Sequence, residues 1–390
     1  MNYHLMIDDK FINDFITDAE KAAPGNNIYI IDQHLEQAAH VKSPLARFAP
    51  YHTPAFQELV KGIGANDKVF IHWLSESAVA FVLSLPEAVP AGVCFWGGDI
   101  VEIPFSRFKR TIYGPKTLKY FEREEERTKV EWNLLKPKLL FKTFKRRYIK
   151  YPKSERHIAT QRDRFFRRLN FFLNWNEIDH QWIHQHYTTN VTLKYFFYNV
   201  NPQPDNNGVA YTKKEPGVTT ILLGNSATST NNHLEALEAL AKFKDEPIKL
   251  VIPLNYGSRQ YGDWVEQKAV AMFGREKVNA LRDFMNRDDY YRLLDEVDIA
   301  FMPHYRSQAV GNTLAMLYRG KKLFLHHKSS VYQLFKRYDV NVHDVANVPN
   351  MTFDAFKTAT APEEIAKDIV RMETIFDTGK KMQVLKELLS

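Results

Sequence analysis

The sequence predicts an α/β protein with two doubly wound domains. Short apolar runs rich in β-branched and aromatic residues alternate with amphipathic helical stretches along most of the chain. A stretch rich in Pro, Asn and Gly, residues 201–217, separates two such arrays. At 390 residues the chain is also longer than one hydrophobic core usually spans. We therefore expect two parallel sheets, each with helices on both faces.

The first array defines a predicted domain over residues 1–205. Helical patterns, for example residues 54–62 and 75–85, lie between its apolar runs, and buried strands separated by helices are typical of a parallel sheet. The expected strands are residues 3–7, 27–31, 68–74, 91–97, 170–175 and 192–200.

The second array defines a predicted domain over residues 218–365, followed by a C-terminal helix over 366–390. Its expected strands are residues 219–223, 249–253, 278–281, 299–303 and 322–325. Helices are expected at about 230–243, 261–272, 288–296, 312–319 and 330–337, and the tail from 362 to 390 has one long helical pattern.

The positive charge is concentrated in one segment. The chain has a net charge of +7, but residues 107–156 contain seventeen Lys/Arg and six Glu, which gives +11 there and −4 elsewhere. Phe, Tyr, Leu and Trp are interleaved with these basic residues, a pattern typical of a helix at a membrane surface. We expect a membrane-facing insertion in the first domain, with Lys142, Lys145, Arg146 and Arg147 on the membrane side.

Several classes of protein are disfavoured. Cys94 is the single cysteine, so we expect no disulfide framework and no cysteine zinc site. The first residues lack the basic and apolar regions of a signal peptide. The longest apolar region, residues 78–96, contains Pro86, Glu87 and Pro90, so it is not expected to span a bilayer.

Two strand ends in the second array suit an anion. Gly224, Asn225 and Ser226 follow one strand, and the run from Arg306 through Gln308 to Gly311, Asn312 and Thr313 follows another. Ligands of doubly wound folds bind at the carboxyl ends of the strands, and helix N-termini there attract phosphates. The alternative interpretation of each strand end is an ordinary turn followed by a helix with a side-chain cap. Two such ends together indicate the two phosphoryl groups of a diphosphate.

Aromatic residues follow the remaining strands of this array. Asn255 and Tyr256 come after one strand, and Phe284 after the next. A flat apolar side chain there can hold a nucleobase, although a turn residue packed into the core is the more frequent case.

In the first array, Asp99 directly follows a strand and His72 lies at the end of its neighbour. A carboxylate at a strand end can act as a general base, so we expect Asp99 to be the catalytic base and His72 the second candidate. A helix cap and a core histidine are the ordinary alternatives. His180 and His184 are spaced i,i+4, but no Glu lies between them in the zinc-protease pattern, so no metal site is predicted.

The segments that contain Gly224–Ser226, Asn255–Gly257, Arg306–Thr313 and "FWGGDIVE" together resemble the 4-acetamido-4,6-dideoxygalactose (Fuc4NAc) transferase family, glycosyltransferase family 56. The likeness is strongest over residues 219–333 and weak in the first array. It implies a GT-B fold, in which two Rossmann-like domains face a central cleft. The first domain would bind the acceptor and the second a nucleotide-sugar.

The resemblance also implies an activity. Family members transfer Fuc4NAc from a dTDP donor to a polyprenyl-diphosphate-linked saccharide, as in the synthesis of enterobacterial common antigen at the cytoplasmic face of the bacterial inner membrane. No cofactor is implied, and the absence of an Asp-x-Asp motif at a strand end predicts that no divalent metal is required. The first hypothesis is an inverting glycosyltransferase. Many GT-B enzymes hold the ribose with a glutamate that this sequence lacks at that position.

Two other functions remain open on the sequence alone. A sugar-nucleotide epimerase would use the same fold, and a nucleic-acid-binding protein would use the basic aromatic segment. Because the rest of the chain is acidic and contains no nucleic-acid-binding motif, we expect no nucleic acid among its partners. The expected partners are a dTDP- or UDP-linked sugar, a polyprenyl-diphosphate-linked glycan and an anionic membrane surface.

The basic segment predicts salt-sensitive membrane binding. Each basic residue near an anionic surface contributes about 1 kcal/mol, and salt screens this attraction. The protein should therefore sediment with phosphatidylglycerol vesicles at low salt, but not with neutral vesicles. Replacing Lys142, Lys145, Arg146 and Arg147 with Glu should abolish sedimentation. Equal sedimentation of parent and variant would contradict a role of these residues in binding.

Overall fold

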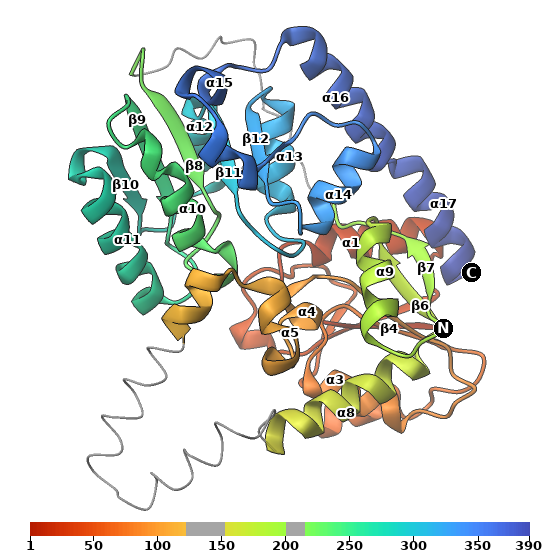
Figure 1. Cartoon of the computed structure of the whole chain (residues 1–390). Coiled ribbons are helices and arrows are strands. Elements are labelled where there is room, and N and C mark those ends of the chain that lie inside the picture. Colours follow the sequence, from red (N-terminus) through yellow and green to blue (C-terminus); the bar gives the residue numbers. More distant parts are fainter. Residues whose placement is uncertain (122–152, 200–214) are drawn as a thin grey trace, which may run out of the picture. The chain divides into compact units, whose positions relative to one another are not determined.

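The structure, a computed structural model, describes residues 1–121, 153–199 and 215–390 (Figure 1). It divides into two compact α/β units. Unit 1 comprises residues 1–107, 151–200 and 375–390, and unit 2 comprises residues 108–150 and 201–374. Each unit is built around one parallel sheet.

Unit 1 has a seven-stranded sheet in the order β3-β2-β1-β4-β5-β6-β7. All its neighbouring strands pair in parallel. The strands are β1 (Asn2–Met6), β2 (Asn27–Ile31), β3 (Ala46–Phe48), β4 (Lys68–Ile71), β5 (Ala91–Cys94), β6 (Phe171–Asn174) and β7 (Thr192–Tyr195). The central strands β1 and β5 are buried along their whole length, as expected of strands covered on both faces.

Helices connect these strands, and the last helix of the chain returns to this unit. They are α1 (Ile12–Ala22), α2 (Pro54–Val60), α3 (Glu76–Ser84), α4 (Gly98–Val101), α8 (Lys153–Arg168), α9 (Glu177–His186) and α17 (Thr378–Leu389), with a 3₁₀ turn, η1 (Leu35–Gln37). Helix α5 (Phe105–Ile112) begins in unit 1, and its residues from 108 onward belong to unit 2. Helix α17 packs beside α1. Leu385, Leu388 and Leu389 join the same apolar cluster as Phe15. The buried Lys381 donates to Asp18 Oδ2 at 2.7 Å, so an ion pair also ties α17 to α1.

Unit 2 has a six-stranded parallel sheet in the order β10-β9-β8-β11-β12-β13. Its strands are β8 (Thr219–Leu223), β9 (Ile248–Pro253), β10 (Val278–Leu281), β11 (Ile299–Met302), β12 (Lys322–Leu325) and β13 (His343–Asp344). Strands β8, β11 and β12 are fully buried and supply the centre of the core.

The helices of unit 2 cover its sheet and are α10 (His233–Leu240), α11 (Arg259–Phe273), α12 (Arg287–Glu296), α13 (Val310–Tyr318), α14 (Ser330–Arg337), α15 (Phe353–Lys357) and α16 (Pro362–Ile375). Shorter 3₁₀ turns are η2 (Ser229–Asn231), η3 (Ala241–Phe243), η4 (Arg275–Lys277) and η5 (Val345–Asn350). Helices α10 and α11 contribute to the same apolar cluster as β8 and β9.

The strand order reverses direction once in each sheet. In unit 1 the chain runs outward from β1 through β2 to β3, then returns to place β4 on the other side of β1. In unit 2 it runs from β8 through β9 to β10 and returns to β11. These two reversals define doubly wound sheets, so the predicted fold class is confirmed.

Some predicted boundaries differ from the structure. Strands β3 and β13 were not expected, because three and two residues are too few to show a pattern. The long C-terminal helix predicted for residues 362–390 is two helices, α16 and α17. Asp377 separates them, because its side chain accepts from the Lys380 N–H and so caps a new helix.

The described start of the basic segment packs within unit 2, which the sequence did not lead us to expect. Residues 115–121 are helical, and Tyr120 lies against Trp264 with ring centroids 4.2 Å apart. Phe108 and Tyr113 are buried as well. These aromatic side chains are therefore occupied by protein contacts rather than presented to a membrane. Lys142, Lys145, Arg146 and Arg147 lie outside the described residues.

No helix within residues 1–121, 153–199 and 215–390 is both long and apolar enough to cross a membrane.

Candidate functional site

The reversal in unit 2 brings two of the predicted strand ends together. Gly224 and Asn225 follow β8, and the segment from His304 to Gln308 follows its neighbour β11. The carboxyl ends of parallel strands meet at one edge of the sheet, and the switch point between them is where doubly wound folds bind ligands.

Hydrogen bonds join the two strand ends. The Gln308 side-chain amide donates to Asn225 Oδ1 at 2.9 Å, and Thr230 Oγ1 donates to Gln308 Oε1 at 2.7 Å. His304 Nε2 donates to Asn225 Oδ1 at 3.2 Å. Burial lowers the pKa of His304 well below its usual range, so the ring is neutral and donates through this one nitrogen. Two predicted residues, Asn225 and Gln308, are thus in direct contact.

One buried amide, that of Asn231, organises the loop after β8. Its Oδ1 accepts from the Asn225 N–H at 2.8 Å and from His304 Nε2 at 2.9 Å. Its Nδ2 donates to the carbonyls of Ser226 and Thr228 at 3.1 and 3.0 Å. A fully buried side chain with all these bonds fixes the loop conformation.

Gly224 is required by this arrangement. Its φ is +69°, in the left-handed region, and a Cβ there would lie 2.5 Å from Asn231 Oδ1. The backbone needs a residue without a side chain for both reasons.

Two of the N–H groups after β8, those of Gly224 and Asn225, are bonded to protein groups. The Gly224 N–H donates to the Phe301 carbonyl and the Asn225 N–H to Asn231. The following helix α10 begins at His233, three residues after the expected Thr230, and Asn232 at its start accepts from the Gly114 N–H at 2.8 Å. No side chain caps the first turn of α10, so the role of its positive end in binding a ligand stays a prediction.

Helix α13 offers a second candidate anion site. Ala309 precedes it with φ +56°, and no side chain caps its first turn. A non-glycine residue in this conformation is strained, and such strain is often found at functional sites. Gly311 and Asn312 lie in the open first turn, Thr313 is buried behind them, and Asn312 Nδ2 donates to Tyr290 Oη at 3.0 Å.

Arg306 lies in the loop between β11 and α13. Its guanidinium donates through NH1 to the Ser307 carbonyl at 2.6 Å, which holds the side chain beside the loop. The side chain is half-buried, so it is held close to the start of α13 while part of it stays accessible.

The loop after β9 is tied to the loop after β8. The Ala227 N–H donates to the Tyr256 carbonyl at 2.6 Å, and the Ser258 N–H donates to the Ala227 carbonyl at 3.0 Å. Gly257 has φ +109°, and a Cβ there would lie 2.7 Å from the Ala227 oxygen. Asn255 and Tyr256 are exposed at this edge, with Tyr256 75% exposed.

Phe284 is the most exposed large apolar side chain of this edge. It follows β10, which pairs with β9, and it is 89% exposed. The ordinary expectation that it packs into the core is wrong. An exposed phenyl ring at the carboxyl edge suits stacking on a flat ligand.

In unit 1, Asp99 lies in the first turn of α4, just after β5. It is 2% exposed, and its Oδ2 accepts from the Leu74 N–H at 2.8 Å. That bond fixes the carboxylate at the carboxyl edge of β4 and β5, which are neighbours in the sheet.

His72 is part of a buried chain of hydrogen bonds. Its Nδ1 accepts from Tyr198 Oη at 2.6 Å, and that hydroxyl oxygen accepts from Trp96 Nε1. Its Nε2 lies 3.2 Å from His4 Nδ1. His4 Nε2 in turn donates to Asn27 Oδ1. Burial lowers the pKa of His4 to about 4 and that of His72 well below its usual range. Both rings are therefore neutral, and both nitrogens of His72 have protein partners.

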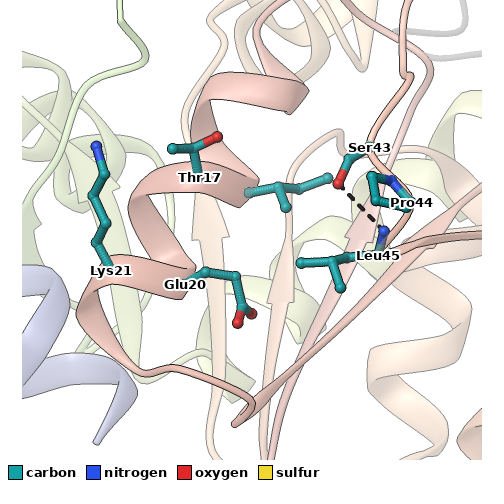
Figure 2. Close-up of a pocket in the computed structure, with 7 residues that line it drawn as sticks. Thr17, Glu20, Lys21, Ser43, Pro44 and Leu45 are labelled. Atoms are coloured by element: carbon teal, nitrogen blue, oxygen red, sulfur yellow. Dashed lines mark hydrogen bonds between the residues drawn. The ribbon is translucent and has the colours of Figure 1, made fainter.

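The other predicted features stay apart from these sites. His180 and His184 are 3.1 Å apart, but both share the Val191 carbonyl. No group of three possible metal ligands occurs in the part of the chain that the structure describes. A cavity of about 420 Å³ between α1 and the loop before β3 is lined by Ile16, Thr17, Glu20, Lys21, Ser43, Pro44 and Leu45. Figure 2 draws these side chains, and none of the candidate residues is among them.

Asn231 and His304 are the site residues that sequence reasoning missed. Asn231 stands in the run "STNNH", where nothing local distinguishes it from Asn232. His304 directly follows a predicted strand, and that position is the one signal that could have included it.

Residues 166–348 match the family model described as 4-alpha-L-fucosyltransferase, glycosyl transferase group 56. The match confirms the resemblance seen in the sequence and spans most of unit 2. The GT-B fold is confirmed by solved structures. WaaG, a glycosyltransferase involved in lipopolysaccharide biosynthesis, has a TM-score of 0.59 at 12% identity, and the alignment covers 100% of this chain and 98% of WaaG.

Two further structures contain nucleotides. The Anabaena protein Alr3699/HepE in complex with UDP and glucose has a TM-score of 0.59 at 12% identity, covering 99% of both chains. An E. coli trehalose-6-phosphate protein bound with UDP-2-fluoro glucose has a TM-score of 0.60 at 10% identity, covering 99% of this chain and 97% of its own. The family domain and the GT-B fold together identify the chain as a glycosyltransferase.

The Asn231 amide should be essential to the loop after β8. Asn231→Ala leaves the Asn225 N–H without its acceptor and removes the nearer of the two acceptors of His304 Nε2. A buried unsatisfied group costs about 1–3 kcal/mol. We expect a lower free energy of unfolding, measured by urea denaturation. Asn231→Asp keeps the acceptor oxygen but puts a second oxygen against the Ser226 and Thr228 carbonyls, so it should destabilise as well. A parent-like midpoint for Asn231→Ala would contradict this role.

Proposed function

We propose that this glycosyltransferase transfers a deoxy-acetamido hexose such as Fuc4NAc from a dTDP- or UDP-sugar to a polyprenyl-diphosphate-linked saccharide. The reaction would invert the anomeric centre without a metal and serve bacterial surface polysaccharide synthesis. The observation that carries the proposal is the contact between Asn225 and Gln308 at the switch point of unit 2, inside the region that matches the family model.

The donor diphosphate would lie against the start of α13. The uncapped first turn, with Gly311 and Asn312, offers backbone N–H groups and the positive end of the helix dipole. Arg306, in the loop just before, supplies a positive charge for one phosphoryl group. Gly224, Asn225 and Ser226 would form the facing wall, because the Asn225–Gln308 bond joins the two loops.

The nucleoside would extend along the same edge, past Asn255 and Tyr256 towards Phe284. These residues follow β9 and β10, the neighbours of β8 in the sheet, and both aromatic rings are exposed. A nucleobase stacks on an aromatic ring whatever its identity, so this edge is compatible with either uracil or thymine.

The acceptor would be activated in unit 1. In the proposed step, the Asp99 carboxylate takes the proton of an acceptor hydroxyl as that oxygen attacks the anomeric carbon, and the bond to the diphosphate breaks. The nucleoside diphosphate leaves with the bonding electrons. Both side chains are buried, and Asp99 is preferred over His72 because both ring nitrogens of His72 have protein partners.

The lipid-linked acceptor places the proposed reaction at the cytoplasmic face of the bacterial inner membrane. The protein would be peripheral and would bind anionic lipid through the basic segment. The charge of +11 over residues 107–156 supports this part of the proposal.

Arg306→Ala should weaken nucleotide binding. Loss of one charge-assisted hydrogen bond costs about 1.5–3 kcal/mol, which corresponds to roughly a tenfold or greater loss of affinity for UDP or dTDP. Titration calorimetry with both nucleotides measures the effect. Arg275→Ala is the matched control, because Arg275 is an exposed arginine that precedes β10 and therefore lies at the opposite edge of the sheet. Parent-like affinity of Arg306→Ala for both nucleotides would refute the diphosphate site.

Asp99→Asn should abolish transfer while leaving the fold intact. The amide oxygen can still accept from the Leu74 N–H, but the side chain no longer takes up a proton. A positioned base contributes about 10²–10⁴-fold to the rate. Turnover of a UDP- or dTDP-sugar with a polyprenyl-diphosphate-linked saccharide measures this loss, and nucleotide affinity should be unchanged. Activity within a fewfold of the parent would show that Asp99 only forms the turn.

A further inference from the structure

Four aromatic side chains gather at the carboxyl edge of the unit 1 sheet, and the proposed reaction gives them no role. Trp96, two residues after β5, lies at the centre of this aromatic cluster. Its ring centroid is 5.8 Å from that of Phe11, 6.0 Å from that of Trp73 and 4.8 Å from that of Tyr198. The four residues follow β1, β4, β5 and β7, so strand ends far apart in the sequence build one cluster.

The aromatic cluster lies at the switch point of the unit 1 sheet. The strand order reverses between β1 and β4, and Phe11 and Trp73 come from the segments after these two strands. Doubly wound folds bind their ligands at this position. Trp73 also precedes Leu74, whose N–H donates to the Asp99 carboxylate, so the cluster is joined to the segment of the proposed base. An acceptor bound in unit 1 would therefore lie against these rings.

Hydrogen bonds hold the central ring, yet the cluster is partly open to solvent. Trp96 Nε1 donates to Tyr198 Oη at 3.1 Å, and this hydroxyl donates to Nδ1 of the fully buried His72 at 2.6 Å. Phe11, Trp73 and Trp96 are each partly exposed. A ring that is fixed in orientation and still accessible can bind a flat apolar face without the cost of reordering the site.

A sugar ring has the chemistry that this cluster fits. The faces of a pyranose carry C–H groups that pack on an aromatic ring, and its hydroxyl groups need polar partners around the edge. The Lys10 ammonium is exposed and lies 5.0 Å from the centre of the Phe11 ring, so it offers a donor beside the cluster. Because the chain is a glycosyltransferase, it binds an acceptor besides its sugar donor.

We propose that Trp96 stacks on a sugar ring of the acceptor saccharide, with Phe11 and Trp73 beside it. This inference rests on the proposed placement of a saccharide acceptor in unit 1. It adds the contact by which a lipid-linked saccharide is selected over a lipid diphosphate without sugar. A nucleobase is the other flat group that such a ring accepts, and nucleotide affinity distinguishes the two.

Titration calorimetry with the full-length chain and two probes tests the proposal. Citronellyl diphosphate that carries N,N′-diacetylchitobiose is the saccharide probe, and citronellyl diphosphate alone is the reference. The ratio of the two affinities measures what the sugar contributes. We expect the parent to prefer the saccharide probe at least about tenfold, because a central Trp is typically among the few residues that supply most of the binding energy. Equal affinities for the two probes would overturn the proposal.

Trp96→Leu and Trp96→Phe form a matched pair of variants. Both remove the hydrogen bond to Tyr198, but only phenylalanine keeps a flat aromatic face. Trp96→Leu should lose the preference for the saccharide probe, whereas Trp96→Phe should keep it within about threefold of the parent. Trp182→Leu is the control, because Trp182 is a partly exposed tryptophan on α9 of the same unit that stacks on His186. A parent-like ratio in Trp96→Leu, or equal ratios in the two Trp96 variants, would contradict stacking.

Tryptophan fluorescence gives a second measurement that does not need the leucine variant. Binding of the saccharide probe should change the emission of the parent, and most of this change should be absent from Trp96→Phe. The same change in both proteins would show that the sugar does not contact Trp96. Circular dichroism melting establishes that the variants are folded.

Nucleotide binding separates this inference from the proposed function. UDP should bind Trp96→Leu as it binds the parent, because the donor is assigned to unit 2. Weaker UDP binding by Trp96→Leu would assign the ring to a nucleobase and overturn the inference. If the parent transfers sugar but does not prefer the saccharide probe, the stacking contact alone is refuted. The proposed donor site fails on a different result, which is parent-like nucleotide affinity of Arg306→Ala.

Discussion

The reversal of strand order is the constraint on which the candidate sites depend. A parallel sheet that grows outward from its first strand and then restarts on the other side leaves two adjacent strands whose connections leave in opposite directions. In unit 2 these strands are β8 and β11, so two loops far apart in sequence lie side by side. The bond between Asn225 and Gln308 exists because of this topology.

Buried side-chain amides determine the conformation of the loops at this edge of the unit 2 sheet. Asn231 bonds to backbone groups of its own loop and, through His304, to the loop after β11. Asn232 holds the segment that follows residue 108, since its side chain accepts from the Gly114 N–H and donates to the Ile112 carbonyl. Glu235 then accepts from the N–H groups of Lys116 and Thr117 and so caps the start of the helix over residues 115–121. Polar groups, rather than apolar packing alone, therefore fix this edge of the unit.

The sequence predicts the sheet strands well because their signal is local. The strands at 219–223, 278–281 and 322–325 have the predicted bounds, since each is a short apolar run between polar residues. Asn225, Gln308 and Asp99 could be selected because they follow strands. The role of Asn231 could not be predicted from the sequence, because it arises from hydrogen bonds to residues up to 73 positions away. The exposure of Phe284 is likewise set by the loop conformation, which no periodicity encodes.

Neither unit is continuous in the chain, and this bears on how the protein is made. Unit 2 includes residues 108–121, which come from within the sequence of unit 1, and unit 1 is completed by α17 at the end of the chain. The buried Lys381 and the leucines of α17 reach Asp18 and the apolar cluster around Phe15 only after residue 389 has been synthesised. Unit 1 therefore cannot reach its final packing while the ribosome is still translating unit 2. For the same reason, a cut in the linker at 201–217 would yield two fragments that each lack a structural element held by the other.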